Sequence, residues 1–193
     1  MVGKVCLFCS SSPKIETKYF EDAGTLAEIF ANQHVGLKYG GGALGLMGKV
    51  ADVYLEKKGN ITGIIPQFML EMGWNHPEVK DMMVVKTMHE RKQKMMEGVD
   101  AVVALPGGCG TLEELSEAIS LKQLGQFTKP IIILNTNHFY DSLLVMFRQM
   151  IDHHFMRNEH QHIWISVTEP SQVLPAIENA PKWDPSFIKI AAV

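Results

Sequence analysis

The stretch LPGGCGTLEEL, residues 105–115, places three glycines directly before two adjacent glutamates. Gly107, Gly108 and Gly110 leave the backbone free to aim N–H groups at an anion, and a helix that follows would add its positive end. The loop therefore fits a phosphate, although no Walker sequence G-K-[ST] follows it. The simpler alternative is a strand-to-helix turn capped by Thr111. Carboxylates would repel a phosphate, so the glutamates must serve another part of a ligand.

The two glutamates are not equivalent on the expected helix. Thr111 and Glu114 also form a capping-box pattern, in which Glu114 would only return a hydrogen bond to the backbone at the start of the helix. Helical spacing places Glu114 on the same face as Ala118 and Leu121, whereas Glu113 lies on a polar face. Glu114 is then the less solvated carboxylate, and a confined carboxylate is poised for acid, base or cation-stabilising chemistry.

Two cations interrupt the apolar stripe of a second expected helix, MHERKQKMMEG. Met88, Arg91, Lys92 and Met95 have the spacing of one helix face, which should be buried. Arg91 suits a sheltered anion site, because its planar fork binds a phosphate or carboxylate through two nitrogens. Lys92 has two equal interpretations: it binds the same anion, or its stem lies along apolar surface with the ammonium group in water.

A second glycine loop, YGGGALG, has the dinucleotide-binding spacing in Gly40, Gly42 and Gly45. That fingerprint also needs an acidic residue at the end of the next strand, and this strand ends in Ile65, Pro66 and Gln67. An NAD-dependent oxidoreductase is therefore disfavoured. The favoured interpretation is a turn that lets the backbone approach a ligand closely, and the alternative is a tight turn needed only for helix packing.

The elements that must position these loops alternate between strand and helix. Short apolar segments predict strands at 4–8, 35–39, 61–66, 101–106 and 130–135, helical patterns fall at 19–33, 44–59, 88–98, 111–125 and 139–155, and 164–180 reads as a last strand and helix. This order predicts an α/β fold: a Rossmann-like, doubly wound parallel sheet flanked by helices, as a single domain of residues 1–180 with a tail at 181–193. The loops FCSSSP, YGGGALGLMG and LPGGCGT should open on one edge of the sheet, where ligands bind.

Composition excludes several classes of partner. The 193 residues are 46% hydrophobic and 20% charged, with a net charge of −3 and no basic cluster, so we expect no nucleic-acid partner. No apolar run is long enough to span a membrane and no signal peptide is present, which predicts a cytoplasmic protein. Three cysteines favour no disulfide framework, and Cys6 and Cys9 are expected in the core. The histidines at 153, 154, 160 and 162 match no zinc spacing and are expected in a solvated region. Twelve methionines indicate adaptable core packing, with an apolar subsite as the alternative.

Taken together, these motifs resemble one family. PGGCGTLEE matches the signature P-G-G-x-G-T-x-x-E, with MHERK and YGGGALGLMG upstream. The chain resembles the cytokinin-activating phosphoribohydrolases (Lonely guy, or LOG, proteins), long labelled lysine decarboxylases, from the first strand to about Pro175. The resemblance implies a homodimer that hydrolyses the N-glycosidic bond of a purine nucleoside 5′-monophosphate, such as AMP or an N6-substituted AMP, and releases base and ribose 5-phosphate. It implies no metal and no other cofactor.

The resemblance also assigns residues. It implies that Arg91 and Glu114 are catalytic. It implies substrate-binding positions at Ser11, Gly41, Gly42, Glu71, Lys92, Gly107, Gly108, Gly110, Thr111, Glu113 and Ser120. Three departures from the family pattern bear on base preference: Cys109 replaces a common aromatic residue, Lys38 an apolar one, and Ser120 the threonine of plant members.

This implied chemistry explains why a phosphate loop precedes a glutamate. Cleavage of a glycosidic bond develops positive charge on the ribose, which a nearby carboxylate stabilises more in the transition state than in the ground state. Glu114 would stabilise that charge and position or deprotonate the attacking water, while Arg91 orients the nucleotide. Alternatives are a general AMP or nucleotide nucleosidase without a cytokinin role, a nucleotide-binding protein without turnover, and the NAD-type oxidoreductase. Pyridoxal-phosphate decarboxylation lacks a recognisable lysine site.

Overall fold

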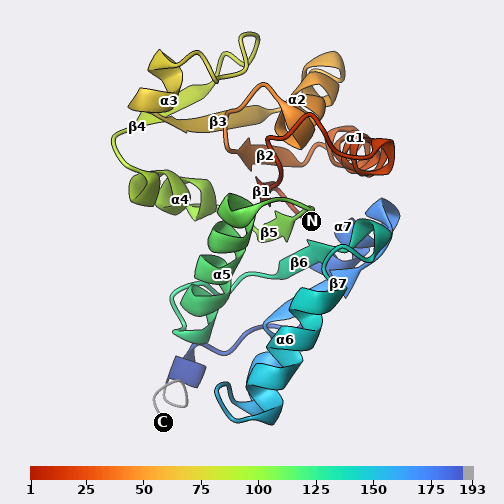
Figure 1. Ribbon diagram of the computed structural model, residues 1–193, viewed down its shortest axis with the longest axis vertical. Helices are drawn as coiled ribbons and strands as arrows, with labels where there is room; N and C mark the ends of the chain where they lie inside the picture. The colour runs from red at the N-terminus through yellow and green to blue at the C-terminus, as the bar shows by residue number, and fades with distance from the viewer. Residues whose placement is uncertain (189–193) are drawn as a thin grey trace.

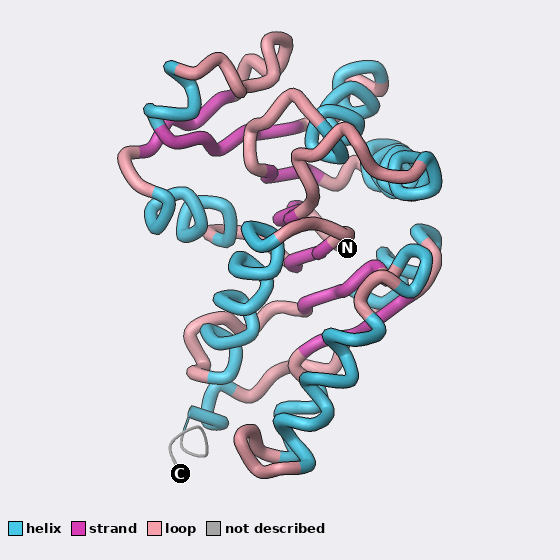
Figure 2. Tube along the Cα trace, viewed as in Figure 1, coloured by secondary structure: helices cyan, strands magenta, loops and turns pink. Residues whose placement is uncertain are grey.

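The computed structural model describes residues 1–188 and contains one seven-stranded, fully parallel sheet with helices on both faces (Figures 1 and 2). The strands are β1 Lys4–Phe8, β2 Gly36–Tyr39, β3 Ile61–Pro66, β4 Met82–Val85, β5 Ala101–Ala104, β6 Ile131–Leu134 and β7 Trp164–Val167. The α-helices are α1 Thr17–Asn32, α2 Gly45–Glu56, α3 Gln67–Glu71, α4 Met88–Met96, α5 Cys109–Gln123, α6 Asp141–Asp152 and α7 Pro170–Glu178. Short 3₁₀ helices occur at Thr136–His138, Asn158–His162 and Pro185–Phe187.

The strand order is β4-β3-β2-β1-β5-β6-β7, so the chain first builds outward from β1 on one side and then on the other. The order reverses between β1 and β5, whose residues Val5 and Ala101 are paired. Ligands in doubly wound folds bind beyond the carboxyl ends of the strands at such a point. The predicted fold class is confirmed, and the loops after β1 and β5 meet where a ligand is expected.

Two apolar cores lie on the two faces of the sheet. Successive residues of β1 alternate between them: Val5 and Leu7 pack with α1, α2 and α7, whereas Cys6 and Phe8 pack with α4, α5 and α6. This alternation follows from the two-residue period of a strand, and it makes every central strand apolar throughout. Cys6 and Cys9 are both buried and belong to opposite cores, as the sequence predicts.

The structure contains two elements that the sequence patterns did not predict, α3 and β4. Within residues 1–188, β4 forms an edge of the sheet, pairs only with β3, and leaves Met83 and Val84 partly exposed. The loop LPGGCGT consequently follows the fifth strand and not the fourth. His160 also corrects an expectation, because it is fully buried and its Nδ1 accepts a hydrogen bond from the Arg157 N–H at 3.0 Å.

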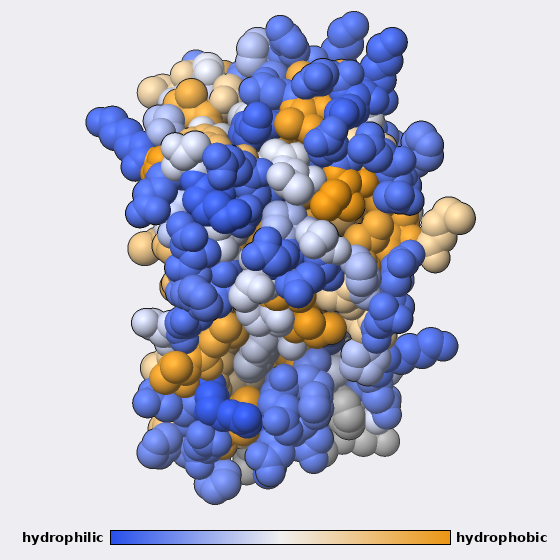
Figure 3. Space-filling model, turned by 90° about the vertical axis from the view of Figure 1, so that its right-hand side faces the viewer, coloured by the Kyte–Doolittle hydropathy of each residue, from blue (hydrophilic) through white to orange (hydrophobic). Residues whose placement is uncertain are grey.

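The predicted tail begins as a packed segment. Trp183 is buried, and its indole N–H donates to the carbonyl oxygen of Lys122 at 2.8 Å. The domain boundary after residue 180 stays a prediction, and residues 189–193 of the tail lie outside the described residues. Hydrophilic residues cover most of the side of the molecule that carries α1 and α7, with hydrophobic residues in small separate groups (Figure 3). Within residues 1–188, no helix has the length and apolar character needed to cross a membrane.

Candidate active site

The three loops singled out in the sequence meet at Ser10, directly after β1. The Ser10 N–H donates to the carbonyl oxygen of Pro106 in the loop after β5, at 3.2 Å. The Ser10 carbonyl accepts hydrogen bonds from Leu46 and Met47 in the first turn of α2, at 2.9 and 3.3 Å. Gly45 makes this approach possible, because a Cβ atom there would lie 2.5 Å from the carbonyl carbon of Ser11. The expectation that the loops share one edge is confirmed.

The same contacts explain why the dinucleotide interpretation of YGGGALG fails. A pyrophosphate bound by that fingerprint needs free N–H groups at the start of the following helix. In α2 the N–H groups of Leu46 and Met47 are already bound to Ser10. Gly45, at φ +64°, serves close packing of the turn against the loop after β1.

Neither helix start has a side-chain cap, but the two differ in their partners: the first-turn N–H groups of α2 are bound to Ser10, whereas among the described residues those of α5 have no such backbone partner. The helix begins at Cys109 with Gly108 as its N-cap residue, two residues earlier than the sequence pattern indicates. Thr111 therefore lies inside the first turn and is not the cap, so the capping-box interpretation of Glu114 is wrong. The first-turn N–H groups of a helix have no intrahelical partners, and here they face a loop of glycines. An anion can approach this helix end closely.

Glu114 is bound to Arg91 instead. The Arg91 Nη1 donates to Glu114 Oε1 at 2.7 Å, and the two residues are only 6% and 7% exposed. Arg91 Nε donates to the Ile64 carbonyl and Nη2 to the Gly40 carbonyl, each at 3.0 Å. The guanidinium group thus joins the ends of β2 and β3 to the first turns of α5. Charge-assisted hydrogen bonds of this kind fix both side chains in one geometry.

Burial raises the pKa of the Glu114 carboxyl above its ordinary value of 4.5, and the neighbouring Arg91 guanidinium partly opposes that shift. Desolvation disfavours the charged carboxylate, whereas a cation in contact with it favours that form. A carboxylate that is shielded from water but held by a cation keeps its negative charge concentrated on the site. It is suited to stabilise a cation that develops in front of it.

A second group of ion pairs lies beside the first. Lys92 of α4 contacts both Glu113 and Glu117 of α5, with 2.7 Å between Lys92 Nζ and Glu117 Oε2. Glu113 is exposed, whereas the side chain of Lys92 is 11% exposed. The ammonium group of Lys92 is therefore not free in water, because the lysine ties α4 to α5. This attachment also holds Arg91 in place. Binding of an anion by Lys92 stays a prediction.

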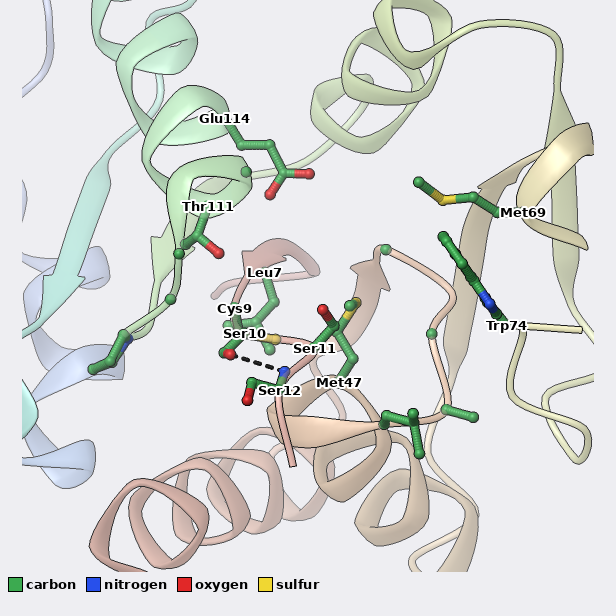
Figure 4. A pocket seen from close by; sticks show the side chains of 18 of the residues that line it. Leu7, Cys9, Ser10, Ser11, Ser12, Met47, Met69, Trp74, Thr111 and Glu114 are labelled. Carbon is green, nitrogen blue, oxygen red and sulfur yellow. Dashed lines mark hydrogen bonds between the residues drawn. The ribbon is translucent and has the colours of Figure 1, made fainter. Parts of the chain in front are cut away.

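These loops and helices surround a cavity of about 880 Å³, which is a normal size for a site that binds a small molecule. Figure 4 shows Thr111 and Glu114 on α5 facing Met69 and Trp74 across this space, with Ser10–Ser12 and Met47 between them. Nine of the predicted site residues line the cavity: Ser11, Gly42, Arg91, Gly107, Gly108, Gly110, Thr111, Glu113 and Glu114. Gly40, in the same glycine turn as Gly42, also lines it.

Four predicted substrate-binding residues do not line the cavity within this chain. Gly41 has φ +77° and faces β3, where an added Cβ atom would lie 3.2 Å from Ile65 Cβ, so Gly40 and Gly42 face the cavity instead. Glu71 is exposed and accepts a hydrogen bond from Gln67 at 2.9 Å. Ser120 is exposed and donates to the carbonyl oxygen of Ser116. The fourth is Lys92.

Several lining residues were not singled out in the sequence. Trp74 lies in a loop without periodicity, whereas Phe139 was expected to begin the helix at 139–155 and in the structure precedes α6. Only their size and apolar character set these two residues apart. Met47, Met69, Met88 and Met95 also line the cavity, which supports the alternative interpretation of some methionines as an apolar subsite. Among the described residues, the charged side chains of the cavity come from α4 and α5, and its hydroxyl groups come from Thr111, Tyr19 and the serines after β1. The side formed by Met69 and Trp74 is mainly apolar, so the site combines an anion-binding end with an apolar one.

Comparisons with known proteins agree with this arrangement. A family model described as "Possible lysine decarboxylase" matches residues 47–177. The chain is 37% identical over 182 residues to the cytokinin riboside 5′-monophosphate phosphoribohydrolase LOG2 of Arabidopsis thaliana, covering 94% of this chain and 85% of that protein. It is 33% identical over 189 residues to LOG7 of the same plant, which is named for the same activity, covering 98% and 86%.

Solved structures show the same fold at lower identity. The molybdenum cofactor carrier protein of Chlamydomonas reinhardtii has a TM-score of 0.71 at 17% identity, covering 93% of this chain and 98% of that one. The molybdenum cofactor binding protein of Rippkaea orientalis has a TM-score of 0.70 at 18% identity, covering 92% and 96%. At this identity the likeness concerns the fold alone. From its sequence relatives, the chain belongs to the LOG family of phosphoribohydrolases, which are hydrolases that act on N-glycosyl bonds.

Proposed function

We propose that this protein hydrolyses the N-glycosidic bond of a purine nucleoside 5′-monophosphate, and that N6-substituted adenosine monophosphates of the cytokinin type are among its substrates. The proposal rests on one observation above all: the buried Arg91–Glu114 pair lies one turn beyond an uncapped, glycine-rich helix start, in one cavity. A substrate phosphate bound at Gly107–Gly110 lies at the start of α5. The sugar attached to it then lies beside Glu114, further along the same helix. The names of the relatives support the same reaction.

In the proposed reaction the bond between the ribose C1′ atom and the base nitrogen breaks, and its electron pair leaves with the base. Positive charge then develops on the ribose, where Glu114 stabilises it. Water attacks C1′ and loses a proton to Glu114, and the departing base takes up a proton from solvent. The products are the free base and ribose 5-phosphate. Arg91 holds the carboxylate in position and opposes the rise in its pKa that burial causes.

The name of the family model points to a different reaction, which the cavity does not favour. Decarboxylation with pyridoxal phosphate needs a lysine that forms a Schiff base with the cofactor. Among residues 1–188, no lysine side chain lines the cavity, and the nearby Lys92 is engaged by two glutamates. The carboxylate–arginine pair supports glycosidic hydrolysis instead.

Incubation with three compounds tests the proposal: AMP, N6-isopentenyl-AMP and adenosine, with separation of base, nucleoside and nucleotide by chromatography. We expect free base from the two nucleotides and none from adenosine, because adenosine lacks the phosphate that the α5 start would bind. A ratio of rates strongly in favour of AMP would indicate the general nucleosidase. Binding of both nucleotides without any release of base would indicate a nucleotide-binding protein and refute hydrolysis.

We also propose that the protein is a homodimer that acts in the cytoplasm. Support for the dimer comes from α6 and the residue group after it, where Val145, Met146 and Phe155 are 57%, 49% and 82% exposed. Large apolar side chains that are exposed close together mark protein interfaces more often than single exposed apolar side chains do. Sedimentation equilibrium should give about twice the chain mass of 21.6 kDa, and a mass near one chain would contradict the dimer.

A further inference from the structure

The wall of the cavity opposite Glu114 comes from a segment that the sequence did not single out. Trp74 follows α3, and together with Met69 it faces Thr111 and Glu114 across the cavity (Figure 4). The Trp74 side chain is half-exposed, at 52%, although it belongs to the largest type of apolar residue. A large aromatic face left open at the rim of a cavity can cover a ligand at little conformational cost.

Trp74 is held there by the glycine turn after β2. The Ala43 N–H donates to the Trp74 carbonyl at 3.1 Å, and the His76 N–H donates to the Gly41 carbonyl at 2.9 Å. Gly42 and Asn75 between them form an isolated antiparallel bridge. The wall and the glycine turn therefore form one unit.

The His76 side chain strengthens this attachment. It is buried, and its Nδ1 accepts a hydrogen bond from the Glu78 N–H, so Nε2 carries the proton and donates to Asp52 Oδ1 of α2 at 3.1 Å. The segment is thus bound to α2 as well as to the turn. A loop fastened at both points can keep an exposed indole in a fixed position.

The strand order indicates which part of a bound nucleotide would contact this wall. The anion-binding start of α5 follows β5, whereas Arg91 contacts carbonyl groups at the ends of β2 and β3 and holds Glu114 on that side. A nucleotide with its phosphate at α5 and its sugar at Glu114 therefore extends away from β6 and toward β3. Trp74 and Met69 both follow β3, whereas Phe139 follows β6 on the other side of the phosphate loop.

From these relations we infer that Trp74 is the residue that recognises the base: its indole stacks on the purine ring, and the adjacent Met69 contacts the edge of the base. The inference rests on the proposed function for the identity of the ligand. The chemistry of the wall agrees with it, since aromatic and thioether groups pack on flat heteroaromatic rings and their apolar substituents, and no charged side chain of the described residues lines this part of the cavity.

Steady-state kinetics of Trp74→Ala and Trp74→Phe test the inference, with N6-isopentenyl-AMP and AMP as substrates. Loss of base stacking should raise KM about tenfold or more in W74A and change kcat little, because the ring binds ground state and transition state alike. W74F should restore most of the affinity. Met72→Ala is the matched control: Met72 is exposed on the same segment and does not line the cavity. An unchanged KM in a folded W74A protein, or a larger effect of Phe139→Ala, would overturn the inference.

Tryptophan fluorescence gives a second reading that does not need turnover. Trp74 lines the cavity, whereas Trp164 is on β7 and Trp183 is buried against α5. AMP should change the emission of the wild type, ribose 5-phosphate should not, and W74F should lose the response to AMP. If the wild type binds AMP with this signal but releases no base, the proposed function fails and the role of Trp74 stands. If it releases base and W74F keeps the full response, only the role of Trp74 fails.

Discussion

The guanidinium group of Arg91 lies 2.7 Å from the carboxylate of Glu114, and both side chains are buried between α4 and α5. A buried ion pair gains little stability overall, because desolvation of two charges offsets much of their attraction. The presence of this pair beside an open cavity therefore indicates a catalytic role more than a stabilising one. The remaining contacts of Arg91 are backbone carbonyls, so the arginine acts on a substrate mainly through the glutamate and the walls that it connects.

The first prediction concerns Glu114→Gln. Glutamine keeps the shape and can still accept a hydrogen bond from Arg91, but it carries no charge to stabilise a ribosyl cation. We expect kcat to fall roughly a hundredfold or more, as when one preorganised electrostatic group is removed. Chromatographic rates of base release from AMP measure the change. Glu117→Gln, on the same helix but not part of the cavity lining, is the matched control for a general loss of charge on α5.

Two outcomes of that comparison would contradict the catalytic role of Glu114. Near-normal turnover in E114Q, with only a lower Tm, would leave the carboxylate a structural partner of Arg91. An equal loss in E117Q and E114Q would point to the overall charge of the helix.

The second prediction concerns Arg91→Lys. An ammonium group on a lysine stem cannot serve the Glu114 carboxylate and the carbonyls of Gly40 and Ile64 together, as the planar fork does. One or more buried acceptors would lose their partner, which costs about 1–3 kcal/mol each in the free energy of unfolding. Urea unfolding measures this loss. Arg148→Lys, at an exposed site on α6, should change stability by much less, and equal effects would contradict the argument.

The third prediction separates two glycines of the phosphate loop. A Cβ atom at Gly107 would lie 2.1 Å from Oγ1 of buried Thr111, whereas one at Gly108 would meet nothing within 4 Å. Gly107→Ala should therefore destabilise the protein by about 1–3 kcal/mol through overpacking. Gly108→Ala should keep the Tm of the wild type but raise KM for AMP, since its methyl group enters the space assigned to the phosphate. A normal KM in G108A would move the phosphate elsewhere.

The fold class could be predicted from the sequence because its central strands are apolar on both faces and alternate with periodic helices. β4 escaped prediction for a physical reason. As an edge strand it contacts a helix layer only in part, so Met83 and Val84 remain exposed and the segment lacks the pattern of a central strand. The five-residue α3 is too short to display a helical period.

Within the site, local sequence identified residue types, and tertiary geometry decided their contacts. Arg91 and Glu114 were separately anomalous, but only the crossing of α4 and α5 brings them together over 23 positions. The start of α5 was misplaced because Gly110 looks like part of the loop yet lies in the helix. Trp74 carries no sequence signal at all, since hydrogen bonds to Ala43, far upstream in the chain, hold its loop in place.

The fourth prediction uses the buried Lys122 at the end of α5, whose ammonium group donates to the Lys129 carbonyl at 3.0 Å. Burial lowers the pKa of Lys122 from 10.5 to about 8. Between these two values the unfolded chain binds more protons than the folded one, so the stability of the wild type should rise with pH relative to Lys122→Met. That relative stability should be lost as pH falls through about 8. Urea unfolding of both proteins from about pH 7.5 to about pH 10 measures the difference, because this range covers the folded pKa and approaches the unfolded one. A constant difference would show that the pKa is not lowered.

The fifth prediction concerns the pH dependence of Glu114, whose pKa is raised above 4.5 by burial. The group must be ionised to stabilise a cation, so kcat/KM should fall as pH drops, with a midpoint above 4.5. The monophosphate of the substrate also titrates, near about pH 6, and could produce a similar limb. A measurement without substrate is therefore needed to assign the limb to the enzyme.

Unfolding of the free protein supplies that measurement. A carboxyl group whose pKa is raised in the folded state binds more protons there, so its contribution to stability is complete below the unfolded pKa and is lost as pH rises through the folded pKa. The free energy of unfolding of the wild type, relative to E114Q, should therefore decrease as pH rises above 4.5. The acid limb of kcat/KM should fall in the same pH range. If the relative stability instead increases with pH, the effect of Arg91 outweighs that of burial and the pKa of Glu114 is lowered in the folded protein. The acid limb of kcat/KM would then belong to the substrate phosphate.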